Sequence, residues 1–197
     1  TEYRCSSFIL WLKYQYFKYA TKGVNGVLAI GNKAMWRYQG HCDAPTIMIP
    51  YTFDMTRLLS FDMLPYDGSS ITFLISGSLE QFRDPIYSIR LYAELKELRP
   101  NVKMNLIISG KGSLYDKIIQ LIKDLGIEDS VTWINEFKEW SEIHEIYKKA
   151  HMLLCFQEYG GWGLIVPEAM AAGLVVACSY TVDSGDNFII DGYNGIS

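Results

Sequence analysis

From Ile71 to its end, the chain alternates short apolar runs with amphipathic helical patterns. The apolar runs lack alternating polar residues, so each predicts a strand that is buried on both faces. Together they predict an α/β fold: a Rossmann-like parallel sheet with helices on both faces. In the clearest helical pattern, Ser113 is the expected N-cap and Gly126 the expected stop. The predicted strands are 71–75, 104–108, 131–134, 152–156 and 174–178, and the predicted helices are 85–98, 113–125 and 141–150.

The beginning of the chain predicts a smaller, incomplete unit. An aromatic helix over 6–20, with Lys13 and Lys18 on one polar side, precedes a partial βαβ remnant. Such a helix can lie on a membrane surface or pack on a sheet or a further domain, and we favour the packed arrangement. The remnant consists of a strand at 26–30, a helix at 32–38 and a strand at 46–50.

The loss of periodicity after this remnant divides the chain. Residues 52–70 end in turn residues and predict a linker between a first unit, 1–51, and a second unit, 71–197. The chain begins without methionine and stops just after a DGYNG turn. We therefore expect a fragment of a longer protein, with its second unit truncated at the C-terminus.

Composition restricts the possible functions. A net charge of −4 argues against a nucleic-acid partner, which would favour a basic face. The sequence His41-Cys42-Asp43 is a poor metal site because adjacent side chains point in different directions. The cysteines lack paired spacing, which is typical of free thiols in a reducing cytosol. We expect a cytoplasmic protein without a metal or cofactor; the alternative location is the inner face of a membrane. The cysteines are Cys5, Cys42, Cys155 and Cys178.

A glycine-rich turn near the C-terminus is the strongest candidate for a ligand site. Residues 158–173 read EYGGWGLIVPEAMAAG and follow a predicted buried strand. The pattern predicts a turn and then a short helix, whose first backbone amides can bind an anion. Glu158 and Glu168 flank the turn and can accept hydrogen bonds from sugar hydroxyls. The residues therefore indicate a ligand that is part phosphate and part sugar, although an ordinary turn of the fold is the alternative.

Other glycine turns should lie at the same place. Gly77, Gly110 and Gly112 also follow predicted strands. Because the carboxyl ends of parallel strands share one edge, and ligands of such sheets bind there, we expect these turns to lie at the same edge as the turn at 160–163.

The order of these features resembles the C-terminal, donor-binding domain of retaining glycosyltransferases of the GT-B fold, the group 1 family (family 4). The likeness covers 71–197, and more loosely 26–70, where GVLAIGNKAMWRYQG and TIMIPYTFD resemble the end of the family's N-terminal domain. The matching pieces are ISGSLEQFRDP, LIISGKGSLYDKI, DSVTWINEF, EIYKKAHMLLCF, EYGGWGLIVPEAMAAGLVVACS and SGDNFIIDGYNGIS.

The resemblance implies roles for the glycine turn. Glu168 would accept hydrogen bonds from the ribose hydroxyls of a nucleotide. The family's earlier acid, which handles the donor sugar, corresponds to Gly160, so Glu158 is the nearest acid that could replace it. The amides of the turn would face the phosphate or the sugar; they belong to Gly161, Trp162, Gly163 and Leu164.

The family also offers two basic residues to the diphosphate. Ser78 stands at the first of these positions, where it would line the donor without a charge. Arg83 stands at the second and suits bidentate phosphate contact, although a solvated surface arginine is the alternative. Lys111 is a weaker, solvent-facing candidate. Asn135 and Glu136 would lie near the base.

The implied function is transfer of a sugar, with retention, from a nucleotide diphosphate to a glycan or lipid-linked acceptor. The missing N-terminal domain of the same polypeptide would hold the acceptor, so we expect this fragment alone to be inactive. One alternative is a nucleotide-binding scaffold module that has lost activity, which the departures at Ser78 and Gly160 favour. The other is a sugar-nucleotide epimerase of similar fold.

Overall fold

The computed structural model describes residues 7–51, 53–59, 66–135 and 144–197. The chain forms two compact units, Thr1–Tyr51 and Thr52–Ser197. In the described part of the chain, no helix has both the length and the apolar character needed to cross a membrane.

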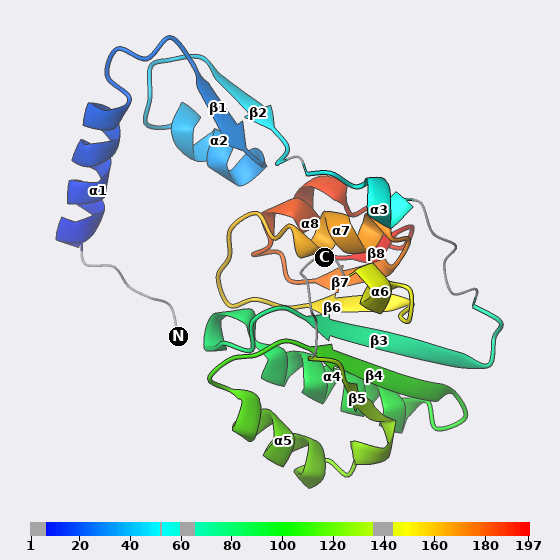
Figure 1. Ribbon diagram of the computed structural model, residues 1–197. Coiled ribbons are helices and arrows are strands. Elements are labelled where there is room, and N and C mark those ends of the chain that lie inside the picture. The colour runs from blue at the N-terminus through cyan, green and yellow to red at the C-terminus, as the bar shows by residue number, and fades with distance from the viewer. Residues whose placement is uncertain (1–6, 52, 60–65, 136–143) are drawn as a thin grey trace. The chain divides into compact units, whose positions relative to one another are not determined.

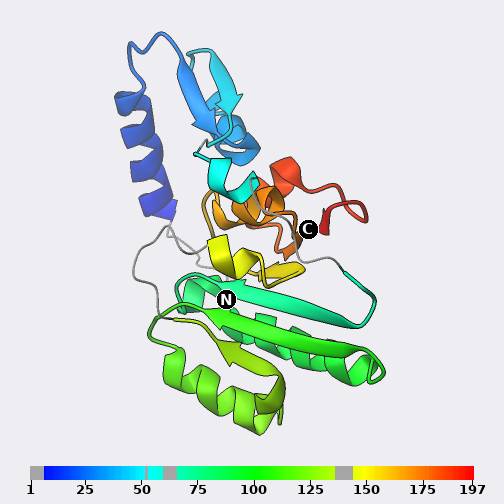
Figure 2. The same ribbon diagram turned by 45° about the vertical axis from the view of Figure 1, so that its right-hand side comes forward.

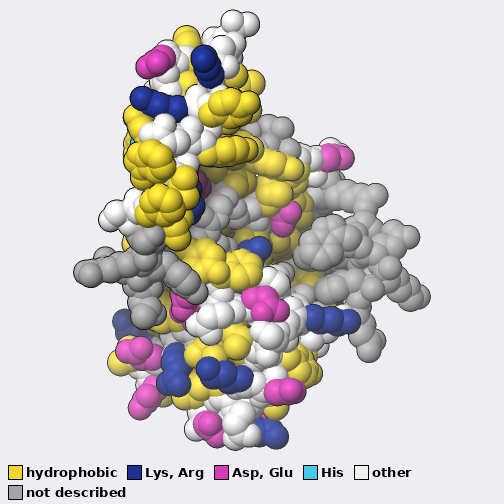
Figure 3. Space-filling model, turned by 90° about the vertical axis from the view of Figure 1, so that its left-hand side faces the viewer, with side chains coloured by type: hydrophobic (Ala, Val, Ile, Leu, Met, Phe, Trp, Pro, Cys, Tyr) yellow, Lys and Arg dark blue, Asp and Glu magenta, His cyan; other side chains and the backbone are white. Residues whose placement is uncertain are grey.

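The first unit contains the expected helix and βαβ remnant. Helix α1 (Ser7–Ala20) precedes strand β1 (Val27–Ile30), helix α2 (Asn32–Gln39) and strand β2 (Thr46–Ile49). The two strands are parallel, and α2 packs on both of them. None of the α1 side chains is buried, and Figure 3 shows hydrophobic side chains gathered over the face that carries α1. An apolar surface therefore remains on this unit.

The second unit is built on a parallel sheet of six strands, as the sequence predicts. In space their order is β5-β4-β3-β6-β7-β8, so the chain reverses its direction of travel between β3 and β6. This topological switch point is where open α/β sheets bind ligands, beyond the carboxyl ends of the strands. The strands are β3 (Ser70–Ser76), β4 (Lys103–Ser109), β5 (Val131–Trp133), β6 (Met152–Cys155), β7 (Val175–Cys178) and β8 (Gly195–Ile196).

Helices cover both faces of this sheet (Figures 1 and 2). Successive strand side chains point to opposite faces, so Phe73 and Ile75 pack under α4 and α5, whereas Leu74 packs under α3, α6 and α7. The helices are α3 (Thr56–Leu59), α4 (Pro85–Leu98), α5 (Tyr115–Asp124), α6 (His144–Tyr147), α7 (Ile165–Ala171) and α8 (Asp183–Phe188), with 3-10 turns η1 (Gln81–Arg83) and η2 (Glu128–Ser130).

Several local features differ from the sequence pattern. The expected N-cap at Ser113 is wrong: α5 begins two residues later, and the Ser113 side chain bonds Glu80 instead. Within the expected linker, α3 forms a short helix whose Leu58 is buried in one of the two cores. Helix α5 does end as expected, because Gly126 adopts the left-handed conformation with φ +62°.

Candidate functional site at the carboxyl edge of the sheet

The loops after β3 and β4 lie against each other at the carboxyl edge of the sheet. The Gly77 N–H donates to the carbonyl oxygen of Ser109 at 2.9 Å, and the Leu79 N–H donates to that of Lys111 at 3.0 Å. A Cβ atom on Gly110 would collide with the carbonyl oxygen of Gly77, so this close approach requires glycine. These two glycine turns therefore lie at the same edge of the sheet, as expected, and are in direct contact.

Arg83 points into the switch point between β3 and β6. A Cβ atom on Gly77 would lie 3.9 Å from Nη1 of Arg83, and the guanidinium charge also acts on Cys155 at the end of β6. Burial nevertheless raises the pKa of Cys155 to about 11, so the thiol stays protonated. Arg83 Nε is buried and has no hydrogen-bond partner among the described residues. Arg83 is thus half-buried, and Ser78 lines the same small hollow.

Neighbouring loops hold the segment that carries Arg83. The Glu80 carboxylate accepts hydrogen bonds from the N–H of Ser113 at 2.9 Å and from its hydroxyl at 2.6 Å. These bonds lower the pKa of Glu80. On the other side, Gln81 Nε2 donates to Glu158 Oε1 at 2.8 Å, and the Glu158 N–H donates to the carbonyl oxygen of Phe82 at 3.0 Å. The loop is therefore tied to the loops after β4 and β6.

The turn from Gly161 to Leu164 joins β6 to α7. Its carbonyl groups accept hydrogen bonds from α8. The Asp183 N–H donates to the carbonyl oxygen of Gly161 at 3.3 Å, and the Ser184 N–H donates to that of Trp162 at 2.9 Å. The four amides of the turn, in contrast, donate no hydrogen bond to any residue that the structure describes. Backbone donors in this condition can bind an anion or a hydroxyl oxygen.

Two glycines of this region differ in what they require. Gly163 has φ +76°, and a Cβ atom there would press on Val182, so the turn needs glycine at this position. Gly160, where the family resemblance places an acid, does not have a positive φ. A Cβ atom on Gly160 would meet the side-chain amide of the buried Gln157 and would lie 3.3 Å from the backbone carbonyl oxygen of Thr181.

Glu168 lies in the first turn of α7 and is half-buried. Its Oε2 accepts a hydrogen bond from the Tyr147 hydroxyl at 2.9 Å. Burial raises the pKa of Glu168, and the bond from Tyr147 acts in the opposite direction. The carboxylate is therefore already bound on one side before any ligand arrives.

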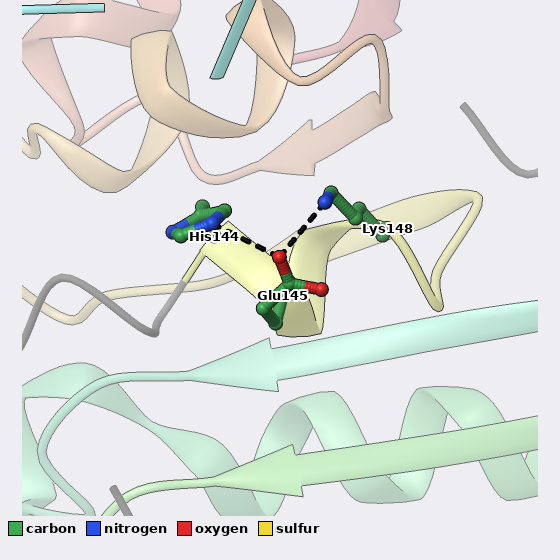
Figure 4. A network of polar contacts seen from close by, with 3 residues as sticks. All are labelled: His144, Glu145 and Lys148. Carbon is green, nitrogen blue, oxygen red and sulfur yellow. Dashed lines mark hydrogen bonds and ion pairs between the residues drawn. The ribbon is translucent and has the colours of Figure 1, made fainter. Parts of the chain in front are cut away.

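Tyr147 comes from α6, a short helix with a polar network along one side (Figure 4). Glu145 Oε1 lies 2.8 Å from Lys148 Nζ and 3.0 Å from His144 Nε2. The hydrogen bond from Lys148 is the main reason that the pKa of Glu145 is lowered. Glu145 therefore links His144 to Lys148 within the helical turn that contains Tyr147.

The residues expected near a base are only partly described. Asn135 follows β5, and its Oδ1 accepts a hydrogen bond from the Gly110 N–H at 2.8 Å, so it joins the same edge of the sheet. Glu136 lies outside the described residues. Lys111 is exposed, as expected.

The described residues contain no cluster of three or more His, Cys, Asp and Glu side chains arranged to hold a metal ion. The Sγ atom of Cys42 instead accepts a hydrogen bond from the Ala44 N–H, and the His41 ring packs on Tyr14 and Phe17.

Residues 60–197 match the family described as glycosyl transferases group 1. The chain is 27% identical over 131 residues to a D-inositol 3-phosphate glycosyltransferase of Corynebacterium diphtheriae, covering 61% of this chain and 30% of that protein. It is 31% identical over 106 residues to an uncharacterized glycosyltransferase of Methanocaldococcus jannaschii, covering 54% of this chain and 26% of that protein. The chain thus spans less than a third of the length of these relatives.

Solved structures of glycosyltransferases share the fold. S. aureus TarM, in complex with UDP among other ligands, superposes with a TM-score of 0.74 at 17% identity, over 92% of this chain and 35% of that one. Anabaena HepE, in complex with UDP and glucose, superposes with a TM-score of 0.72 at 17% identity, over 100% of this chain and 54% of that one. The expected α/β class and the GT-B likeness are confirmed.

Proposed function

This chain belongs to the group 1 glycosyl transferases, and we propose that it supplies the nucleotide-sugar-binding half of a retaining enzyme of family 4. The observation that carries the proposal is the position of Arg83. A half-buried guanidinium, with an unpartnered Nε, lies at the switch point of a parallel sheet. A buried donor without a partner is costly, and a diphosphate oxygen would satisfy it.

The second unit offers a complementary group for each part of a nucleotide sugar. Arg83 would bind the diphosphate, with Ser78 beside it in the same hollow. The unused amides from Gly161 to Leu164 would bind phosphate or sugar oxygens, and Glu168 would accept from the ribose hydroxyls. Asn135 and Glu136 would lie near the base.

The proposed chemistry follows from charge. When the glycosidic bond to the donor breaks, the leaving diphosphate gains negative charge, and a fixed guanidinium stabilises that charge more than it stabilises the bound donor. In this proposal the reaction proceeds with retention and without a metal or cofactor. Glu158 would hold the donor sugar in place of the family's acid, after its carboxylate leaves Gln81.

The acceptor in this proposal is a glycan or a lipid-linked sugar, held by the N-terminal domain of the whole polypeptide, of which residues 1–51 would be the end. Cys155 and Cys178 are buried and form no disulfide bond, which suits a reducing cytoplasm. We place the enzyme there, at the inner face of a membrane where its acceptor is lipid-linked.

Calorimetry on the full-length protein tests the donor site. A charge-assisted hydrogen bond contributes about 1.5–3 kcal/mol, so Glu168→Ala should weaken nucleotide binding on the order of 10- to 100-fold. Glu128→Ala, which removes an exposed acid from η2, is the matched control and should bind as the wild type does. Unchanged affinity in a folded Glu168→Ala variant would remove this residue from the site.

A scaffold module without transferase activity is the second candidate, because Ser78 replaces a basic residue and Gly160 an acidic residue of the family pattern. A labelled nucleotide sugar separates the candidates. A retaining transferase yields a glycosylated acceptor with the donor's anomeric configuration, and a scaffold binds nucleotide without turnover. An epimerase yields an altered nucleotide sugar and no transfer.

A further inference from the structure

We propose that Tyr147 is a positioning residue for the donor site: it holds the Glu168 carboxylate so that one oxygen stays available to the ribose. This inference rests on the proposed function, because it assigns Glu168 to the nucleotide. It adds a residue from α6, an element that the sequence pattern did not connect with the site.

The geometry gives Tyr147 a single polar task. The residue is 1% exposed and packs among the apolar side chains shared by β6, β7 and α7. A buried tyrosine hydroxyl needs a partner, and this one donates to Glu168 Oε2 at 2.9 Å. Glu168 Oε1 has no hydrogen-bond partner among the described residues. The tyrosine therefore occupies one carboxylate oxygen and leaves the other for a ligand hydroxyl.

The presenting helix is itself held. The Lys148 N–H donates to the carbonyl oxygen of His144 at 3.4 Å, and the Ala150 N–H donates to that of Tyr147 at 3.1 Å. The Glu145 side chain bridges Lys148 and His144 on the polar side of the same turn. Both the ring and its backbone are thus fixed, so the hydroxyl arrives at Glu168 from a defined direction.

The contact also acts on the charge of Glu168. Burial favours the neutral acid, whereas the tyrosine O–H favours the carboxylate that a ribose hydroxyl needs as an acceptor. The elements packed against α7 contribute further titratable groups. Among the residues whose side chains the structure describes, these are Cys155 on β6, Cys178 on β7, and Asp183 and Asp186 on α8. Among described residues, Tyr147 is the one that hydrogen-bonds the Glu168 carboxylate.

Tyr147→Phe in the full-length protein tests the inference, because it keeps the ring and removes only the hydroxyl. We expect the affinity for a nucleoside diphosphate to fall on the order of tenfold at neutral pH. The acidic limb of the affinity–pH profile should also move to higher pH, because the carboxylate has lost its donor. The bare nucleoside should lose affinity by the same factor, since the contact is to the ribose.

Tyr92→Phe is the matched control. Tyr92 is also buried, and its hydroxyl donates to the Met104 carbonyl oxygen at 3.0 Å in the core on the opposite face of the sheet. This variant should lose stability and keep the wild-type affinity profile.

The possible results separate this inference from the proposed function. If wild-type protein binds no nucleotide, the proposed function fails and this inference fails with it. If Glu168→Ala weakens binding while Tyr147→Phe changes only the melting temperature, as Tyr92→Phe does, Tyr147 is a packing residue and only this inference is overturned. A tenfold loss with a shifted pH profile supports it.

Discussion

Glu168 has a partly buried carboxyl group in the proposed ribose site. Burying its charged form destabilises the folded protein by an amount that depends on pH. Burial raises the folded-state pKa of Glu168 above its ordinary value of 4.5. The protonated acid therefore makes its full favourable contribution to the free energy of unfolding below the unfolded-state pKa. This contribution is lost as pH rises through the folded-state pKa. Removing the charge should stabilise the protein at neutral pH.

Glu168→Gln is the variant that isolates this effect, because its side-chain oxygen can still accept from Tyr147. We expect its melting temperature to exceed that of the wild type at neutral pH, and the gap to close below about pH 4.5. Thermal melts across this range, without ligand, measure the gap. A gap that is constant with pH, or that grows on acidification, would contradict the raised pKa.

Gly160 tests the interpretation of the missing acid. Its backbone does not have a positive φ, so Gly160→Glu should fold after small shifts of the Gln157 amide and the Thr181 carbonyl group. If Glu158 serves the donor sugar, Glu158→Gln should lower kcat more than nucleotide affinity, and adding Gly160→Glu should restore part of the loss. Steady-state kinetics on the full-length enzyme measure both.

Gly163→Glu is the control for this series. It should destabilise the protein, because its φ is +76° and its Cβ would press on Val182. If Glu158→Gln turns over at the wild-type rate, Glu158 only holds Gln81 in place, and the scaffold function is favoured.

At the residue scale, the sequence pattern and the family resemblance assigned Arg83 and Glu168 to the donor site, and these roles stay predictions. Sequence reasoning missed Tyr147, Glu80 and Gln81 as parts of the site. Their partners lie 21, 33 and 77 residues away in the chain, and the pairs form only when the sheet brings separate loops together. A single tyrosine in an amphipathic helical pattern predicts a packing residue of the hydrophobic core.

Among the structural elements, the loop after β3 makes the clearest prediction. It positions Arg83 through hydrogen bonds to two other loops: Glu80 accepts from Ser113, and Gln81 donates to Glu158. At its end, Asp84 caps α4 by accepting from the Tyr87 N–H at 3.1 Å, and Pro85 fixes the first helical residue. The turn that carries Arg83 is therefore held at both ends.

Glu80→Ala should release one side of this loop. We expect a weaker affinity for a nucleoside diphosphate and an unchanged affinity for the bare nucleoside, because only the guanidinium is displaced. Glu97→Ala, an exposed acid on α4, should change neither. Equal losses for both ligands in calorimetry of Glu80→Ala would indicate general damage to the site.

The accuracy of the predicted elements depended on how clear their apolar pattern is. Helix α4 was predicted to the residue, because its amphipathic pattern is long, and each of the five predicted strands was found, because an uninterrupted apolar run marks a buried strand. The two-residue β8 and the six-residue α8 were missed, since they are too short to show a period. The start of α5 was misplaced because Ser113 bonds a distant glutamate in preference to its own helix.

On the scale of the whole molecule, the second unit contains both hydrophobic cores, including Leu58 and the partly buried Phe53 from before β3. We predict that residues 52–197 expressed alone melt cooperatively, bind a nucleoside diphosphate and catalyse no transfer. Binding should raise the melting temperature by mass action. A ligand concentration of 100 times the dissociation constant adds about 2.7 kcal/mol to the free energy of unfolding. A shallow, non-cooperative melt would show that this unit depends on residues 1–51.

The order of strands was the part of the architecture that the pattern alone could not give. Alternating strands and helices predict a parallel sheet, but they do not say which strands are neighbours. The switch point between β3 and β6, and therefore the meeting of Arg83 with Cys155, emerged only from the sheet order.

The most direct test of the account compares a nucleoside diphosphate with its bare nucleoside by calorimetry on the full-length protein. The wild type should bind the diphosphate more tightly, and Arg83→Ala should lose most of that difference while its affinity for the nucleoside stays unchanged. Arg90→Ala, which removes an exposed arginine from α4, should behave as the wild type does. A folded Arg83→Ala variant that keeps the full preference for the diphosphate would contradict the proposal that the switch point is the donor site.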